Sequence, residues 1–208
     1  MGRHAGWMAA SSALARTNKE DAPQVIVLPE TIFNQKEFLS LVKNNVNKHG
    51  YCVVVVSEGV KNSKGKFLAE SDKKDAFGHS QLGGVSLFIS NLINNKLKLK
   101  NHWAVADYLQ RSARHIASRV DLEHAQAVGS FAIKYAIAGM NGVMPIIVRK
   151  KGSKYKWGVE AAPLSKIANL EKKLPKGFIS KNGMNVTQKA IDYLMPLIQG
   201  ESHPPFKN

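Results

Sequence analysis

The chain has 208 residues, 44% of them hydrophobic, and a formal net charge of +15 from 30 Lys and Arg against 15 Asp and Glu. Such a chain can bury a core and need not be disordered. Its single cysteine excludes an internal disulfide framework and suits the reducing cytoplasm. No apolar run approaches the roughly 20 residues that span a bilayer, so we expect no membrane partner and a cytoplasmic location.

The first part of the chain alternates predicted helices and apolar strands. We expect a helix over residues 9–15, a strand over 25–28 between two prolines, a helix after an Asn34 N-cap that ends at His49-Gly50, and a strand over 51–56. Strands that are apolar on both faces and alternate with helices are typical of a parallel sheet. We therefore predict an α/β fold with an open, mostly parallel sheet flanked by helices.

The remaining elements follow the same hydrophobic patterning, with longer polar stretches between them. Residues 61–80 are polar and loop-like, 82–93 predict a helix, 97–105 an extended segment, and 112–138 a long helical stretch interrupted where Asp121 can cap a second helix. Strands are expected at 143–148 and 157–161, and helices at 164–170 and 187–197.

The candidate binding residues follow from the position of the predicted sheet. Ligands of open parallel sheets lie at the carboxyl ends of the strands. Glu58 directly follows the second strand, where its carboxylate can accept a hydrogen bond from a sugar hydroxyl, although a solvated strand-end acid is an equal alternative. Tyr108 and Arg111 lie three residues apart near the start of a predicted helix, where a phenol and a guanidinium group can bind a phosphate. Capping of the helix at the protein surface explains the pair equally well.

Two further segments carry glycines beside a charged or titratable residue. Met1-Gly2-Arg3 opens the chain with a turn that suits close backbone approach to an anion, and we expect a strand upstream of it. His79 lies in a glycine-rich segment that is either a ligand loop or a helix-entry turn. The histidines show no metal-ligand spacing with carboxylates, so no metal site is predicted. The positive charge favours an anionic partner, but the lysines are scattered and no RNA-binding motif is present, so nucleic acid is the weakest alternative.

Several ordered segments together resemble the 6-phosphofructokinases, and most closely their pyrophosphate-dependent branch. The resemblance rests on Met1-Gly2-Arg3, Ser57-Glu58-Gly59, the two segments Phe77-Gly78-His79 and Leu82-Gly83-Gly84, Tyr108-Leu109-Gln110-Arg111, the segments 107–118, 138–149 and 197–201, and Pro204-Pro205. It covers essentially the whole chain. The fold that it implies is the C-terminal lobe of a phosphofructokinase-like enzyme, with residues 1–208 as a single portion on the sugar-phosphate acceptor side.

The resemblance also implies roles for individual residues. Met1, Gly2 and Arg3 match the motif that contacts the sugar phosphate, with Arg3 steadying the charge of the transferring group. Glu58 matches the acid that holds the sugar hydroxyls. Tyr108 and Arg111 match the pair that grips the 6-phosphate. The family also draws an arginine from a neighbouring subunit, and the nearby positions here hold Lys98, Lys100 and His102.

The family's donor loops and its Thr-Ile-Asp-x-Asp motif precede the Met-Gly-Arg motif and are absent from this chain. The expected function is transfer of a phosphoryl group from pyrophosphate or ATP to the 1-hydroxyl of fructose 6-phosphate in glycolysis. We expect Mg²⁺ to be bound mainly by the missing N-terminal portion, the isolated chain to be inactive, and the partners to be that portion and other copies in a homo-oligomer. The alternative is a non-catalytic sugar-phosphate-binding or regulatory lobe.

Overall fold

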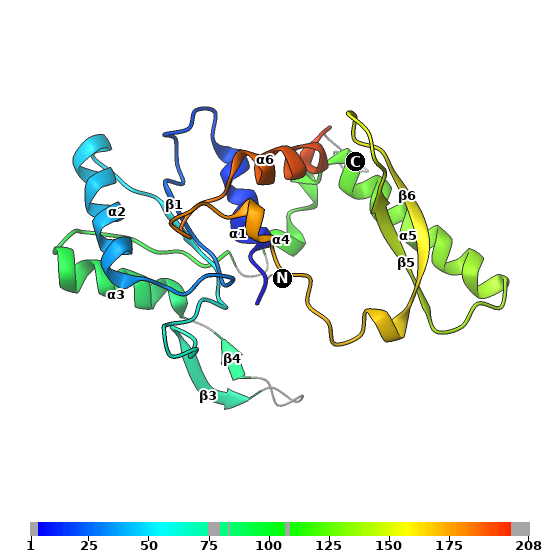
Figure 1. Cartoon of the computed structure of the whole chain (residues 1–208), viewed down its shortest axis with the longest axis horizontal. Helices are drawn as coiled ribbons and strands as arrows, with labels where there is room; N and C mark the ends of the chain where they lie inside the picture. The colour runs from blue at the N-terminus through cyan, green and yellow to red at the C-terminus, as the bar shows by residue number, and fades with distance from the viewer. Residues whose placement is uncertain (1–3, 75–79, 83, 107–108, 201–208) are drawn as a thin grey trace, which may run out of the picture. The chain divides into compact units, whose positions relative to one another are not determined.

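The computed structural model describes residues 4–74, 80–82, 84–106 and 109–200, with only the backbone described for residues 70–74, 80–82, 110 and 111. The chain divides into two compact units (Figure 1). Unit 1 comprises Met1–Val105 and Glu171–Tyr193, and unit 2 comprises Ala106–Leu170 and Leu194–Asn208. Unit 1 is therefore discontinuous in sequence, because the chain leaves it, forms most of unit 2, and returns.

Unit 1 is built on a parallel strand pair. Strand β1 (Val25–Val27) pairs with β2 (Val54–Val56) in the register Val25↔Val54 to Val27↔Val56. On its other side, the Ile26 amide donates to the carbonyl of Met184 at 3.0 Å, so β1 lies between β2 and a late segment of the chain. This pair with its flanking helices confirms the predicted α/β class.

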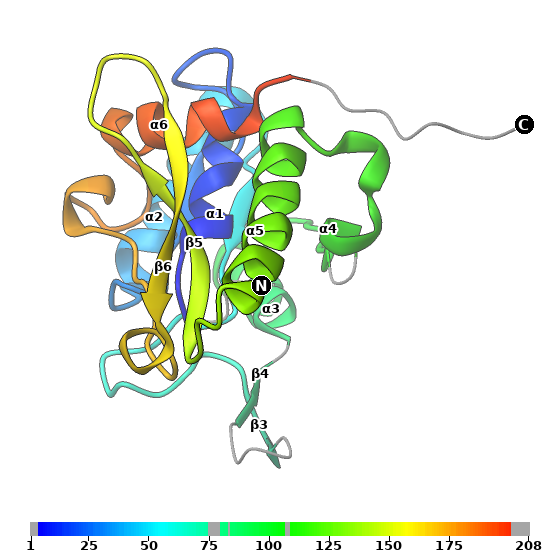
Figure 2. The same ribbon diagram turned by 90° about the vertical axis from the view of Figure 1, so that its right-hand side faces the viewer.

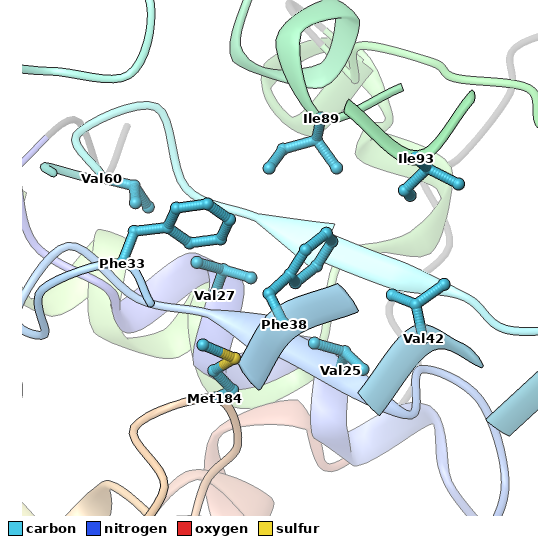
Figure 3. Packing of buried hydrophobic residues seen from close by; sticks show 9 residues of the cluster. All are labelled: Val25, Val27, Phe33, Phe38, Val42, Val60, Ile89, Ile93 and Met184. Carbon is cyan, nitrogen blue, oxygen red and sulfur yellow. The ribbon is translucent and has the colours of Figure 1, made fainter. Parts of the chain in front are cut away.

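The helices of unit 1 cover both faces of β1. Val25 and Val27 pack in one buried cluster with side chains of α2 (Gln35–His49) and α3 (Val85–Leu97), as Figure 3 shows. Leu28 points to the opposite face, where its Cδ2 approaches Gly6 at the start of α1 (Trp7–Ser11). A 3-10 turn at Ser12–Ala15 follows α1, and its Ala13 is also buried. Because β1 is buried on both faces, every position of Val25–Val27 is apolar.

The ends of α2 follow from local chemistry, as predicted. The Asn34 side chain accepts a hydrogen bond from the Glu37 amide at 3.2 Å, and Gly50 ends the helix in the left-handed conformation with φ of 79°. Unit 1 also holds the antiparallel pair β3 (Glu70–Lys74) and β4 (Ser80–Leu82), a 3-10 turn at Lys176–Phe178, and most of α6 (Gln188–Leu194).

Unit 2 is an antiparallel ribbon with one long helix beside it. Strand β5 (Val143–Arg149) pairs with β6 (Trp157–Pro163), and α5 (Arg119–Ile137) lies alongside (Figure 2). The His124 side chain anchors α5 to the ribbon, since its Nε2 lies 3.0 Å from the Tyr155 hydroxyl and its ring packs edge-on against Trp157. The shorter elements are α4 (Leu109–Ser112) and 3-10 turns at Arg114–Ile116, Leu164–Lys166 and Met195–Ile198.

Some local predictions were wrong, for identifiable reasons. The polar segment 61–80, predicted as a loop, contains β3, and β4 begins at its last residue and extends into the segment predicted as a helix. The strand predicted over 51–56 is regular only over Val54–Val56, because the pairing partner β1 is limited by the flanking Pro23 and Pro29. The helix predicted at 164–170 is a short 3-10 turn, and residues 97–105 form no strand. The N-cap of α5 is Ser118, whose Oγ accepts from the Asp121 amide at 3.1 Å, so Asp121 lies in the first turn.

Candidate functional site

The parallel pair of unit 1 brings two acidic residues to one edge. Both strands run in the same direction, so the residues after β1 and after β2 leave the ladder at their shared carboxyl edge. Glu58 follows β2 in a turn that starts at the buried Ser57, whose amide donates to the Val27 carbonyl at 3.1 Å. Glu58 itself is exposed, and it makes no hydrogen bond or ion pair with another described residue. Its carboxylate is therefore open to an external hydroxyl donor.

Glu30 follows β1 at this edge, and its carboxylate binds the backbone of Gly6 and Leu174. Its Oε1 accepts hydrogen bonds from the amides of Gly6 at 2.8 Å and Leu174 at 2.9 Å. Its Oε2 is buried and accepts no hydrogen bond within the described part of the chain. A β-carbon on Gly6 would lie only 2.6 Å from Glu30 Oε2 and 2.9 Å from Leu28 Cδ2, so this close approach requires glycine.

A cluster of ion pairs holds the residues that follow the Met-Gly-Arg motif. His4 Nδ1 lies 2.6 Å from Glu171 Oε1, and Lys173 Nζ lies 2.5 Å from Glu171 Oε2 and 2.6 Å from the His4 carbonyl oxygen. The hydrogen bond from Lys173, followed by that from His4, holds the pKa of the Glu171 carboxyl below its usual range. Trp7 Nε1 also donates to the Lys172 carbonyl at 2.7 Å. Residues 4–7 are thus tied to the segment 171–174 by both backbone and side-chain contacts.

An open pocket of about 580 Å³ lies beyond the strand ends in unit 1. Its walls come from the segments that follow β1 and β2 and from α3. The lining residues are Ile32, Phe33, Asn34, Gln35, Lys36, Asn62, Ser63, Leu68 and Phe88. This volume is within the range of small-molecule sites, about 300–1,000 Å³. The lining therefore combines amide, hydroxyl and ammonium groups with apolar side chains.

The predicted site residues are only partly placed. Met1, Gly2, Arg3 and Tyr108 lie outside the described residues, as does His79. The backbone of Arg111 belongs to α4 in unit 2, whereas Glu58 lies in unit 1. The structure therefore places Glu58 at a strand end, as the sequence rule requires, and the joint site with Tyr108 and Arg111 stays a prediction.

Sequence reasoning missed the residues that hold the strand-end edge together. Glu30 follows an apolar strand just as Glu58 does, so the rule that selected Glu58 also selects Glu30. His4 and Glu171 are separated by 167 positions, and no local pattern joins them. Across the described residues, no group of three or more His, Cys, Asp or Glu side chains is arranged to hold a metal, and no helix is long and apolar enough to cross a membrane.

Comparison with known proteins shows the family to which the chain belongs. The family profile described as phosphofructokinase matches residues 1–136, and the chain belongs to this family. It is 51% identical over 206 residues to a protein of Methylococcus capsulatus named pyrophosphate–fructose 6-phosphate 1-phosphotransferase, with 99% of this chain and 49% of that protein covered. It is 50% identical over 208 residues to a protein of the same name from Halomonas elongata, with 100% of this chain and 50% of that protein covered.

Solved structures show the same correspondence. The pyrophosphate-dependent phosphofructokinase of Nitrosospira multiformis superposes with a TM-score of 0.85 at 46% identity, covering 100% of this chain and 48% of that one. The fold is therefore that of the phosphofructokinases, as predicted. The chain spans about half the length of the relatives that it matches.

Proposed function

We propose that this chain supplies the fructose 6-phosphate side of a pyrophosphate-dependent phosphofructokinase, which transfers a phosphoryl group to the sugar 1-hydroxyl. The 51% identity over 206 residues to a relative of that activity carries the proposal. The relatives' names favour pyrophosphate over ATP as the donor. The proposal places the enzyme in glycolysis, in the cytoplasm and in a homo-oligomer.

The predicted residues divide between the sugar hydroxyls, the 6-phosphate and the transferring group. Glu58 accepts hydrogen bonds from the sugar hydroxyls, a role supported by its exposure and its lack of a partner among the described residues. Tyr108 and Arg111 grip the 6-phosphate with a phenol donor and a guanidinium fork. Arg3, beside Met1 and Gly2, stabilises the negative charge that spreads over the transferring group. Together they hold the acceptor in position for in-line transfer.

The donor side belongs to the half of the fold that this chain does not span. Phosphoryl transfer needs Mg²⁺ and a donor site, and the proposal assigns both to that other half, because the chain spans about half the length of its relatives. A chain that holds only the acceptor groups lacks a base and a donor site, and we therefore expect it to be inactive alone. Its first partner is the complementary half of the enzyme.

The test measures turnover and sugar binding separately. We expect no fructose 1,6-bisphosphate from the purified chain with pyrophosphate, Mg²⁺ and fructose 6-phosphate. We expect turnover after co-expression with the polypeptide that corresponds to the uncovered half of the Methylococcus capsulatus relative. Turnover by the chain alone would contradict its assignment as an acceptor half, and sugar binding without turnover in any assembly would favour the non-catalytic lobe.

The role of Glu58 has its own measurement. In calorimetry on the assembled protein, Glu58→Gln should weaken fructose 6-phosphate binding roughly tenfold to hundredfold, since a hydrogen bond to a charged group contributes about 1.5–3 kcal/mol. The matched control is Glu123→Gln, another exposed carboxylate. Equal affinities for the wild type and Glu58→Gln would remove Glu58 from the site.

A further inference from the structure

The partly buried His4 side chain joins the start of the chain to the segment that follows the second strand of unit 1. His4 directly follows Arg3, which the proposed function places at the transferring group. Its ring stacks on the Phe67 ring, with the ring centroids 5.4 Å apart and the ring planes at 17°. Phe67 belongs to the segment after Glu58, residues 59–68, which we call the Glu58 loop. The stack therefore connects the two chain segments that carry predicted site residues in unit 1.

The Phe67 ring is held in a fixed position relative to the backbone that carries Glu58. The two ends of the Glu58 loop meet, since the Leu68 amide donates to the Val60 carbonyl at 3.0 Å. An isolated antiparallel bridge pairs Lys61 with Phe67, and the Lys61 Nζ lies 4.8 Å from the centre of the Phe67 ring. Val60 is fully buried and lies only two positions after Glu58. A residue that stacks on Phe67 is thus positioned against the turn that presents Glu58.

The hydrogen bond to Glu171 fixes the orientation of the His4 ring. Stacking alone lets one ring slide over another, whereas a hydrogen bond to a ring nitrogen defines where that nitrogen lies. His4 Nδ1 lies 2.6 Å from Glu171 Oε1, and this carboxylate partner assigns the proton to Nδ1. Lys173 Nζ binds the other Glu171 oxygen at 2.5 Å and the His4 carbonyl oxygen at 2.6 Å. Both the ring and the backbone of His4 are therefore held.

Separate contacts hold the residues that come after His4. The Glu30 carboxylate accepts a hydrogen bond from the Gly6 amide, and the Trp7 indole donates to a backbone carbonyl of the returning segment. Because these contacts do not involve the His4 side chain, we expect the fold of this region to survive when that side chain is shortened. What a shorter side chain removes is the contact between the Met-Gly-Arg motif and the Glu58 loop.

We propose that His4 is a positioning residue for phosphoryl transfer, which aligns Arg3 with Glu58 through its stack on Phe67 and its hydrogen bond to Glu171. This rests on the proposed function, in which Glu58 binds the sugar hydroxyls and Arg3 stabilises the transferring group. Arg3 is joined to His4 by one planar peptide bond, so a change in the His4 backbone displaces Arg3 directly. A misplacement of about 1 Å in an active site can lower a rate about a hundredfold.

The experiment uses the chain assembled with the complementary half of the Methylococcus capsulatus relative. His4→Ala should lower kcat at least about tenfold and change the dissociation constant of fructose 6-phosphate, measured by calorimetry, less than about threefold. This split is expected because the lost alignment affects the transferring group in the transition state, whereas the groups that bind the hydroxyls and the 6-phosphate remain. The matched control is His49→Ala, which should retain the wild-type kcat. His49 is also partly buried in unit 1 and beside an aromatic ring, but it ends α2 on the amino-terminal side of β2.

Two further variants separate positioning from a purely structural role. Phe67→Leu should lower kcat about as much as His4→Ala, and the double variant should lose little more than either one, because both changes remove the same contact. His4→Phe keeps a ring over Phe67 and loses the bond to Glu171, so it should recover part of the kcat that His4→Ala loses. A general loss of stability would instead give additive losses and a lower melting temperature.

Hydrogen exchange on the chain alone provides a measurement that needs no turnover. His4→Ala should speed exchange of the Asn62 and Leu68 amides, which are hydrogen-bonded within the Glu58 loop, and leave Val25–Val27 unchanged. The proposal is overturned if the wild-type assembly turns over and His4→Ala matches its kcat, if sugar affinity falls as far as kcat, if the losses of the double variant add, or if exchange in the loop is unchanged. An inactive wild-type assembly would refute the proposed function and with it the catalytic role of His4, and the exchange measurement would still decide whether His4 holds the loop.

Discussion

Replacing Gly6 by alanine is expected to lower the unfolding free energy of unit 1 by about 2–4 kcal/mol. The new methyl group would lie 2.6 Å from Glu30 Oε2, 2.9 Å from Leu28 Cδ2 and 3.1 Å from Pro29 Cδ. Leu28 is fully buried and the proline ring is rigid, so the carboxylate must turn or the strand must shift. Overpacking costs about 1–3 kcal/mol. The hydrogen bond from the Gly6 amide to the Glu30 carboxylate contributes about 1.5–3 kcal/mol when intact, and its partial loss adds about 1 kcal/mol, which gives the expected total.

Urea denaturation followed by tryptophan fluorescence measures this loss. Trp7 is the next residue in the chain and packs against Phe178 and Tyr193, so its emission reports on the region that Gly6→Ala disturbs. The control is Gly177→Ala in unit 1, because a β-carbon added to Gly177 would meet no other group within 4 Å. If Gly6→Ala unfolds within about 0.5 kcal/mol of both the wild type and the control, the tight approach to Glu30 does not stabilise the fold.

Three other measurements test separate parts of the structure. Asn34→Ala removes the acceptor for the Glu37 amide and should cost about 1 kcal/mol in urea denaturation, whereas Asn34→Ser should retain most of the stability. Burial raises the pKa of the Cys52 thiol from 9.0 to about 11, which lowers the fraction of reactive thiolate at pH 8 about a hundredfold. A disulfide reagent should therefore label the folded chain about a hundredfold more slowly than the urea-unfolded chain. Equal labelling rates would refute this. Lys173 lowers the pKa of Glu171, so its stabilisation is complete above the ordinary value of 4.5 and is lost as the pH falls through the folded value. Glu171→Gln should therefore flatten the acid limb of the stability curve, and an unchanged limb would contradict the ion pair's contribution.

The elements that local chemistry defines were predictable from the sequence. Asn34 and Gly50 mark the ends of α2 because an amide cap and a left-handed glycine are requirements of the helix ends themselves. The apolar run between Pro23 and Pro29 marks β1 for a similar reason. The strands β3 and β4 were not predictable, because their polar residues carry no apolar alternation and pairing with each other defines them.

The same distinction between local sequence signals and contacts made by folding applies to the candidate site. Glu58 was found because its position after an apolar strand is visible in the sequence, and the same rule reaches Glu30. The contacts of His4 with Glu171 and of Trp7 with Lys172 join the two ends of unit 1 in space, and only the folded chain reveals them. The family resemblance supplied Met1, Gly2, Arg3, Tyr108 and Arg111 as site residues, and their roles remain predictions.

The discontinuity of unit 1 sets an order on its folding during synthesis. Strand β1 is complete once residue 27 is made, but its neighbour at Met184 is more than 150 residues further along the chain. At 5–20 residues per second, that neighbour arrives about 8–30 s later. Throughout this interval one edge of a fully apolar strand has no native partner, and unpaired edges are where nascent chains associate wrongly. We therefore expect chains truncated before Met184 to aggregate more readily than chains that include it.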